Sequence, residues 1–138
     1  MDAPTTVTRT IDTELTADEL WSLIAEGDRW PEWMVDEAEV AVEPGAAGRV
    51  AEGGVERDVA IREVAPGHHV SFEWWPSGEP ELASAVDLHV LPAVHGSVLH
   101  VVESFPSVSA SAQASAAAWT ARESRLQACW RTRLLIAA

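Results

Sequence analysis

Three charged residues stand at positions where the surrounding pattern calls for an apolar side chain, which makes them the first candidates for chemistry. Arg57 and Glu103 each fall on the inward face of an alternating strand. Glu123 lies about 40° from Trp119 on a helical projection, inside the apolar sector of a helix. Arg9 joins them if its strand keeps the same alternation. Because a buried charge is costly unless it is paired, these residues either pair with one another or face a ligand.

Two interpretations of this charged set remain open. In the structural one, Arg57 pairs with Glu103, with Glu123 or with both, and the pairing rigidifies the interior. In the functional one, a glutamate faces a partly dry cavity and binds or protonates a ligand. Because ligand cavities are mostly lined by apolar side chains, Phe72, Trp74 and Trp119 are candidates for the cavity wall. Ordinary core packing would explain these three residues equally well. The candidate ligand-binding residues are therefore Arg57, Phe72, Trp74, Glu103, Trp119 and Glu123.

The five histidines do not predict a metal site. His68, His69 and His95 fall in turns, and no predicted element carries two histidines at a metal-ligand spacing. His89 and His100 are predicted to be neighbours on the outer face of paired strands. The sequence also lacks glycine-rich nucleotide loops and a serine-hydrolase elbow. We therefore expect no metal and no cofactor, and we assign no catalytic residue.

The segments that must position the charged residues are mostly short strands. Alternation and β-branched residues predict strands over residues 5–15, 36–43, 49–52, 55–65, 70–75, 82–91 and 98–105. Hairpin spacings between them indicate a meandering antiparallel sheet of six to seven strands. After the first strand, a capping box at Thr16 and Glu19 begins a short helix that ends at Gly27, and residues 28–34 form a second short helical piece.

Alternation also assigns the inward face of the sheet. The inward sets are Val55, Val59 and Ile61, then Val70, Phe72 and Trp74, then Leu82, Val86, Leu88 and Val90, and finally Leu99, Val101 and Phe105. Residues 107–138 contain neither Pro nor Gly and carry apolar side chains at helical spacing. They predict one long C-terminal helix packed on that inward face, which makes the fold class α+β.

Composition narrows the range of partners. The chain has 138 residues and a formal net charge of −13, and all nine of its basic residues are arginine. This acidity disfavours nucleic acid and anionic membranes as partners. The length fits a single domain over residues 1–138, and Cys129 alone excludes an intramolecular disulfide. We see no membrane-spanning stretch and no signal peptide, and we expect a cytoplasmic protein.

Several local stretches resemble the SRPBCC superfamily, which has the START-like or helix-grip fold. They are LTADELW at residues 15–21, RWPEW at 29–33, Gly48, SFEWWP at 71–76 and GSVLHVVES at 96–104. The branch that the chain most resembles is that of the heat-shock ATPase activator homologue-like proteins. The resemblance covers essentially the whole chain. It implies an incomplete antiparallel barrel that grips the C-terminal helix, with a ligand cavity between them.

The resemblance also orders the functional hypotheses. The leading one is a non-enzymatic module that binds a small hydrophobic or amphipathic molecule in the cavity between sheet and helix. The second is a polyketide cyclase- or aromatase-like enzyme that uses Glu103 or Glu123 as acid or base. The third is an interaction protein that assists a chaperone. A second copy of the chain, forming a homodimer, is kept as a further partner.

Overall fold

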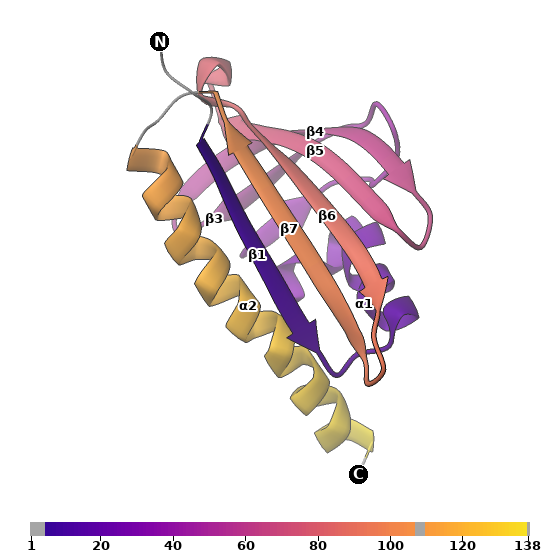
Figure 1. The fold of residues 1–138 in the computed structure, drawn as a ribbon. Coiled ribbons are helices and arrows are strands. Elements are labelled where there is room, and N and C mark those ends of the chain that lie inside the picture. The colour runs from indigo at the N-terminus through magenta and orange to yellow at the C-terminus, as the bar shows by residue number, and fades with distance from the viewer. Residues whose placement is uncertain (1–4, 107–109, 138) are drawn as a thin grey trace.

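The computed structural model of the protein describes residues 5–106 and 110–137. Seven strands form one antiparallel sheet, and a long C-terminal helix lies alongside it (Figure 1). Two short helical segments follow the first strand, as the sequence predicts. The elements in chain order are β1 (Thr5–Thr13), α1 (Ala17–Ala25), η1 (Gly27–Glu32), β2 (Glu37–Glu39), β3 (Ala47–Glu52), β4 (Val55–Ala65), β5 (His69–Pro76), η2 (Pro80–Leu82), β6 (Ser84–Pro92), β7 (Ser97–Phe105) and α2 (Ala110–Ala137).

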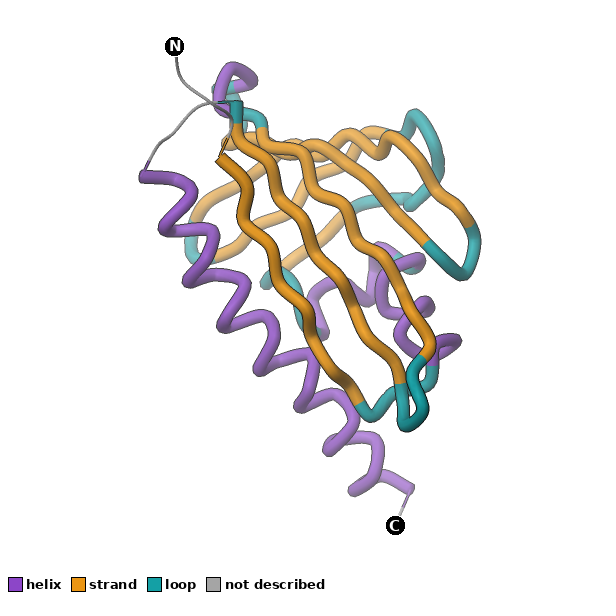
Figure 2. Tube along the Cα trace, in the orientation of Figure 1, coloured by secondary structure: helices purple, strands orange, loops and turns teal. Residues whose placement is uncertain are grey.

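Strands β2 to β7 form an antiparallel meander, and β1 pairs with β7 at one edge of the sheet. Strands lie in the order β1-β7-β6-β5-β4-β3-β2, and every pairing is antiparallel. Helix α2 packs along β1, while β3 and β4 curve behind β1 and β7 in the view of Figure 2. The predicted α+β helix-grip architecture, with seven strands, is therefore confirmed. Residues 107–109 and 138 of the predicted terminal helix lie outside the described residues.

Two tryptophans fix the short helices to the core. Helix α1 begins with the predicted capping box. Trp30 and Trp33 in and after η1 are fully buried, and their indole N–H groups donate to the carbonyl oxygens of Ile24 at 2.9 Å and Leu23 at 3.1 Å. These carbonyls belong to the last turn of α1, where no intrahelical donor is left for them. The buried indole N–H groups therefore gain acceptors, and the carbonyl groups at the end of α1 gain donors.

The inward face of the sheet is buried as alternation predicts, with two exceptions. The buried set includes Val59, Ile61, Val70, Phe72, Trp74, Val86, Leu88, Val90, Leu99, Val101 and Phe105. Leu82 was predicted to point inward but is 50% exposed, because it belongs to η2 and β6 begins only at Ser84. Val55 is 42% exposed, because it directly follows the turn that joins β3 to β4.

The second predicted strand, over residues 36–43, is shorter than expected. It ends at Glu39, where the backbone of Val40 passes close against Gly27 and Gly48. A Cβ atom on Gly27 would lie 1.9 Å from the Val40 carbonyl oxygen, so only glycine permits this approach. In the middle of the sheet, β5 begins at His69, which the sequence assigned to a turn.

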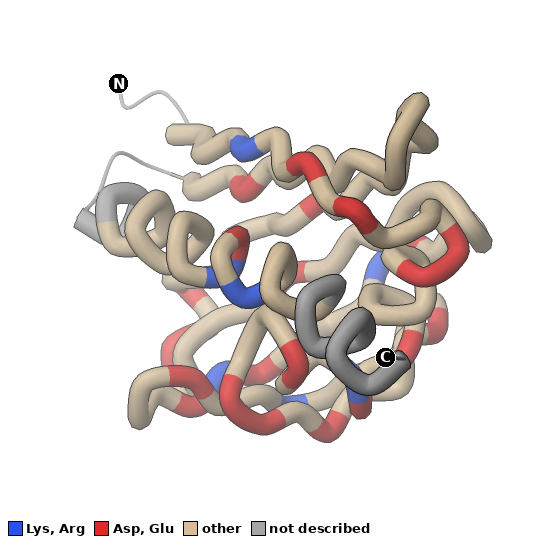
Figure 3. The backbone as a smooth tube through the Cα atoms, turned by 90° about the horizontal axis from the view of Figure 1, so that it is seen from below, with Lys and Arg blue, Asp and Glu red and all other residues tan. Residues whose placement is uncertain are grey.

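Acidic residues outnumber basic ones and are scattered along the chain. Figure 3 shows Asp and Glu at many places along the backbone and fewer Arg positions, some of them on α2. Over residues 5–106 and 110–137, no helix combines the length and hydrophobicity needed to cross a lipid bilayer.

Candidate functional site

Helix α2 turns one mixed face toward the sheet. Its described side chains that are buried are those of Ser115, Trp119, Arg122 and Leu126, spaced four, three and four residues apart. At about 100° per residue these positions fall within about 60° of one another. Glu123 lies about 70° from the centre of that stripe on the same projection, and it is half-buried. The apolar stripe is therefore interrupted by Arg122 and not, as the sequence predicted, by Glu123.

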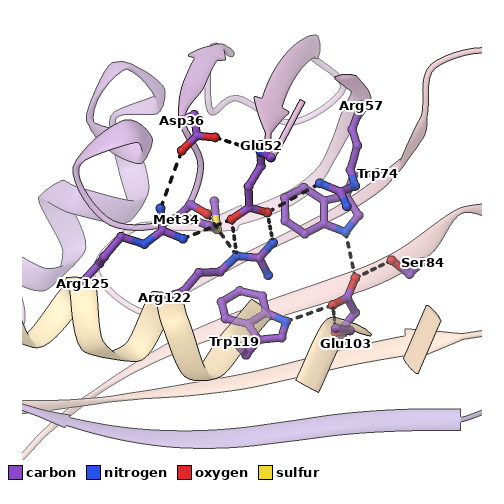
Figure 4. Close-up of polar contacts among 12 residues, drawn as sticks. Met34, Asp36, Glu52, Arg57, Trp74, Ser84, Glu103, Trp119, Arg122 and Arg125 are labelled. Carbon is purple, nitrogen blue, oxygen red and sulfur yellow. Dashed lines mark hydrogen bonds and ion pairs between the residues drawn. The ribbon is translucent and has the colours of Figure 1, made fainter. Parts of the chain in front are cut away.

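Glu103 of β7 is 3% exposed and accepts four hydrogen bonds (Figure 4). Its Oε2 atom accepts from Trp74 Nε1 at 2.8 Å and from Ser84 Oγ at 2.5 Å. Its Oε1 atom accepts from Ser115 Oγ at 2.5 Å and from Trp119 Nε1 at 2.9 Å. The donors come from β5, β6 and α2, so this one carboxylate joins three strands to the helix. Four donors match the acceptor capacity of an ionised carboxylate.

A second cluster lies around Glu52, at the end of β3. Arg122 is 2% exposed; its Nη2 atom forms an ion pair with Glu52 Oε1, and its Nε atom donates to Oε2 at 3.2 Å. The same Nε atom lies 3.0 Å from the carbonyl oxygen of Met34. Arg125 Nη2 donates to Glu52 Oε2 at 3.1 Å. Glu52 therefore balances the positive charge that α2 brings to the sheet.

Two indole rings separate the clusters and couple them (Figure 4). The guanidinium carbon of Arg122 lies 4.5 Å from the ring centroid of Trp119 and 5.1 Å from that of Trp74. Both rings direct their N–H groups at Glu103. Each indole thus presents its electron-rich face to a cation and its donor edge to an anion. Arg122 and Glu103 support the same two rings without a direct contact between them.

Arg57 of β4 has fewer polar partners than Glu103 and Arg122. Its Nη1 atom is the one buried side-chain polar atom without a hydrogen-bond partner among the residues that the structure describes. Its ion-pair partner, Glu52 Oε1, lies 3.6 Å away, and its guanidinium carbon lies 5.3 Å from the Trp74 ring centroid. Burial lowers the pKa of Arg57; Glu52 opposes this shift and Arg122 adds to it. The predicted pairing of Arg57 with Glu103 or Glu123 is replaced by this longer contact with Glu52.

The two clusters border a cavity of about 160 Å³ between the sheet and α2. Its polar lining consists of Arg57, Ser84, Glu103, Ser115 and Arg122. Its other lining residues are Trp74, Trp75, Pro76, Leu82, Phe105, Ala114 and Ala118. An engineered cavity of about 150 Å³ holds benzene, whereas drug-sized ligands occupy about 300–1,000 Å³. The cavity therefore suits a single ring or a short branched chain.

A larger hollow of about 370 Å³ lies over β2 and β3, at the other edge of the sheet. Its charged lining residues, Glu37, Glu39, Arg49 and Glu56, are all exposed. Exposed charges are solvated and need no ligand. Of the two hollows, the smaller one offers the stronger reason for a ligand to bind.

The structure separates the six residues that the sequence nominated. Arg57, Trp74 and Glu103 line the cavity. Phe72 is 1% exposed and packs between Trp30 and Trp74, with ring centroids 5.1 and 5.2 Å away. It belongs to the core behind the cavity wall.

The remaining nominated residues lie on or beside α2. Trp119 is fully buried and acts through its N–H bond to Glu103. Glu123 belongs neither to the cavity lining nor to the clusters around Glu103 and Glu52. Arg9 does face inward, and its Nη2 atom donates to the carbonyl oxygen of Ala116 at 3.1 Å, so it holds β1 against α2.

Sequence reasoning missed several members of the site. Arg122 lies three residues after Trp119 and four before Leu126, so the spacing of the stripe pointed to it. Ser84 has the inward parity of β6 and could have been found in the same way. Glu52 gave no signal, because its importance depends on arginines from α2 that reach it only in the folded protein.

Solved structures share this fold. Protein MLL2253 from Mesorhizobium loti superposes with a TM-score of 0.81 at 16% identity, over 93% of this chain and 98% of that one. The Aha1 dimer from Colwellia psychrerythraea gives 0.77 at 10% identity, over 89% and 93% of the two chains. DynU16, from the dynemicin biosynthetic locus, gives 0.78 at 22% identity over 96% of this chain and 48% of its own, so the present chain spans about half of DynU16. Identities this low establish a common fold alone.

No curated protein sequence matches the chain. A family model does: the model described as Activator of Hsp90 ATPase homolog 1-like protein matches residues 14–132. That range contains the cavity lining and both polar clusters. The chain therefore belongs to the Activator of Hsp90 ATPase homolog 1-like family, within the SRPBCC superfamily.

Proposed function

We propose that the protein binds a small amphipathic molecule with an acidic head group in the cavity between the sheet and α2. The observation that carries this proposal is the buried Nη1 atom of Arg57, which has no hydrogen-bond partner among the described residues. A buried polar group left unsatisfied costs about 1–3 kcal/mol, and more when it is charged. An acidic group bound against Arg57 would remove that cost.

The charges around the cavity also favour an anion. Arg57 and Arg122 line it together with one acid, Glu103, whose oxygens already accept four hydrogen bonds. Arg122 is engaged by Glu52 at hydrogen-bond distance, whereas Arg57 reaches Glu52 only at 3.6 Å. A guanidinium offers planar N–H donors whose geometry matches a carboxylate. Arg57 is thus the cavity cation with donors to spare.

The apolar walls and the volume limit the rest of the ligand. Trp74, Trp75 and Phe105 supply aromatic surface beside the charged group. Within about 160 Å³ there is room for one ring or a short branched chain, but not for a fused polycyclic skeleton. The proposed ligand class is therefore a small aromatic or branched carboxylic acid.

The enzyme alternative finds no specific support in the site. A general acid or base must present a proton or a free lone pair to its substrate. Glu103 uses both oxygens on four donors, and Glu123 does not line the cavity. The likeness to DynU16 is one of fold.

The chaperone-assisting alternative would need an exposed apolar surface. The large apolar side chains exposed among the described residues are Val55, Leu82, Leu91 and Val94. They fall in or beside three different connections of the sheet, which does not favour a shared docking face. A homodimer, as in the Aha1 structure that shares the fold, and a cytoplasmic location stay predictions.

Calorimetric titration with benzoate and with the neutral benzamide tests the proposal. The two ligands have the same ring and differ in charge. A charged hydrogen bond contributes about 1.5–3 kcal/mol, so benzoate should bind about tenfold or more tightly than benzamide. Arg57→Gln should remove this preference. Arg62→Gln, on the same strand but exposed and paired with Glu73, is the matched control and should preserve it.

Three outcomes would contradict the proposal. Equal affinities for benzamide and benzoate would mean that the head group is not recognised as an anion. Binding of benzoate by Arg57→Gln with the wild-type affinity would mean that Arg57 does not hold the acidic group. Failure of the wild type to bind benzoate, or the branched acid isovalerate, at millimolar concentration would remove the proposed ligand class altogether.

A further inference from the structure

A row of histidines crosses the outer face of the sheet, on the side opposite the cavity. His69 of β5 pairs with His89 of β6, and His89 pairs with His100 of β7. Directly paired residues project from the same face of a sheet, so imidazoles from three neighbouring strands lie in line. Asp87 stands two residues before His89 and therefore shares this face. The sequence predicted the pair of His89 and His100 but not the presence of the other two side chains.

His69, Asp87 and His89 form the compact part of the row. His69 Nε2 lies 3.0 Å from Asp87 Oδ1. The rings of His69 and His89 stack with centroids 4.2 Å apart. One potential ligand atom from each of the three residues lies within 4.8 Å of those of the other two. All three side chains are half-buried, so packing restricts them while solvent still reaches them.

We propose that His69, Asp87 and His89 form a binding site for a divalent transition-metal ion of the Zn²⁺ type. Two imidazole nitrogens and one carboxylate oxygen are a donor set that Zn²⁺ accepts, and Co²⁺ and Ni²⁺ accept it as well. Tetrahedral ligands at about 2.0–2.1 Å from the metal lie about 3.3 Å from one another. The distance between His69 and Asp87 is already close to that value.

The movement that binding requires is small. The ligand atom of His89 must approach the other two by at most about 1.5 Å, the difference between 4.8 Å and the tetrahedral spacing. Rotation of a half-buried imidazole between staggered side-chain conformations supplies such a shift and unstacks the rings. Because the three residues stand on paired strands, the backbone that carries them is already in place.

The surroundings favour a cation at this position. The chain carries a formal net charge of −13, which raises the local concentration of cations around it. His100 lies at the far end of the row, with its ring centroid 6.5 Å from that of His89 and its Nδ1 atom 3.2 Å from Thr10 Oγ1. It is therefore not one of the three ligands. Three protein ligands leave a coordination position open to water.

Calorimetric titration of tag-free protein with ZnCl₂ alone tests this site, which lies on the opposite face from the proposed ligand cavity. We expect the wild type to bind one equivalent. His69→Ala, Asp87→Asn and His89→Ala should each weaken binding by about tenfold or more. His95→Ala, in the exposed turn between β6 and β7, is the matched control and should leave the affinity unchanged.

Ring-nitrogen spectra of the ¹⁵N-labelled wild type give a second reading that does not depend on any variant folding. Zn²⁺ should shift the ring signals of His69 and His89 and leave that of His95 in place. Absence of Zn²⁺ uptake by the wild type would overturn the site. So would uptake that the three substitutions leave intact, or a shift of the His95 signal in place of the other two.

Discussion

Glu103 and Arg57 line the same cavity, yet only Glu103 has a full set of hydrogen-bond partners within the chain. Glu103 accepts four hydrogen bonds from two indoles and two hydroxyls. Arg57 Nη1 has none among the described residues, and its carboxylate neighbour stands at 3.6 Å. Glu103 is buried and its charge would be costly without partners, whereas Arg57 is half-buried with its Nη1 atom enclosed. The fold therefore supplies every hydrogen-bond donor that the Glu103 carboxylate needs, but it does not supply an acceptor for Arg57 Nη1.

The origin of the donors explains this contrast. The partners of Glu103 come from β5, β6 and α2, so they converge only when the helix docks on the sheet. Losing any one of them disturbs a shared network. Arg57 contributes to no such junction, since the strong contacts of Glu52 go to Arg122 and Arg125. Glu103 is therefore satisfied within the fold, whereas Arg57 Nη1 has no hydrogen-bond acceptor among the described residues.

Glu103→Gln should have the largest effect on stability. The amide replaces one acceptor oxygen by a donor; the neighbouring serine hydroxyl can rotate to accept from it, but the indole N–H on that side loses its acceptor. With about 1–3 kcal/mol for that buried donor and about 1 kcal/mol more for the lost charge on the remaining hydrogen bonds, the free energy of unfolding should fall by about 2–4 kcal/mol. Urea denaturation followed by circular dichroism measures this. A loss below about 1 kcal/mol would remove the structural half of the comparison.

Arg122→Met should come next. It keeps a long apolar stem but removes the cation held between the rings of Trp74 and Trp119. Glu52 retains Arg125 and Arg57 as partners, so the expected loss is only about 1–2 kcal/mol. Arg125→Met, on the same helix but 38% exposed at the side chain, is the control and should cost less. Equal losses for the two variants would show that the ring contacts contribute nothing measurable.

Arg57→Gln should affect ligand binding more than stability, the opposite of Glu103→Gln. It removes an incompletely paired group, so the free energy of unfolding should change by no more than about 1 kcal/mol. The same variant should lose the preference for benzoate over benzamide described above. Urea denaturation and calorimetry on one protein preparation provide both numbers. A loss of stability as large as that of Glu103→Gln would place Arg57 in the structural framework and end the contrast.

Glu123→Gln should have the smallest effect. The sequence places Glu123 inside the apolar sector of the helix and nominates it as a ligand-binding residue. The structure places Glu123 outside the cavity lining, so neither benzoate affinity nor stability should change by more than about 0.5 kcal/mol. A tenfold drop in benzoate affinity for Glu123→Gln would restore the original prediction.

The sequence predicted the fold and one face of the site, but not how the site is connected. Period-two alternation correctly placed Glu103 and Arg57 on the inward side of the sheet. Alternation cannot reveal which residues of α2 meet them, since that depends on the rotation of the helix. The gap between Trp119 and Leu126 can be filled at 122 or at 123, and the wrong choice hid Arg122.

The sequence also did not predict side-chain clusters that form across paired strands. The cluster of His69, Asp87 and His89 exists only through the register of β5 against β6, while spacing rules compare residues within one element. Placing His69 in a turn, one residue before the predicted strand, was enough to lose it. The register of paired strands is set by turns and burial together. A shift of one residue moves a side chain to the opposite face of the sheet.

A crystal structure of the wild type grown with benzoate would show whether Arg57 binds an acidic group in the cavity. The benzoate ring should lie against Trp74 inside the cavity, with a carboxylate oxygen about 2.7–3.2 Å from Arg57 Nη1. Glu103 should keep its four donors unchanged. A benzoate that binds elsewhere, or an ordered water that satisfies Nη1 in a cavity free of ligand, would contradict this expectation.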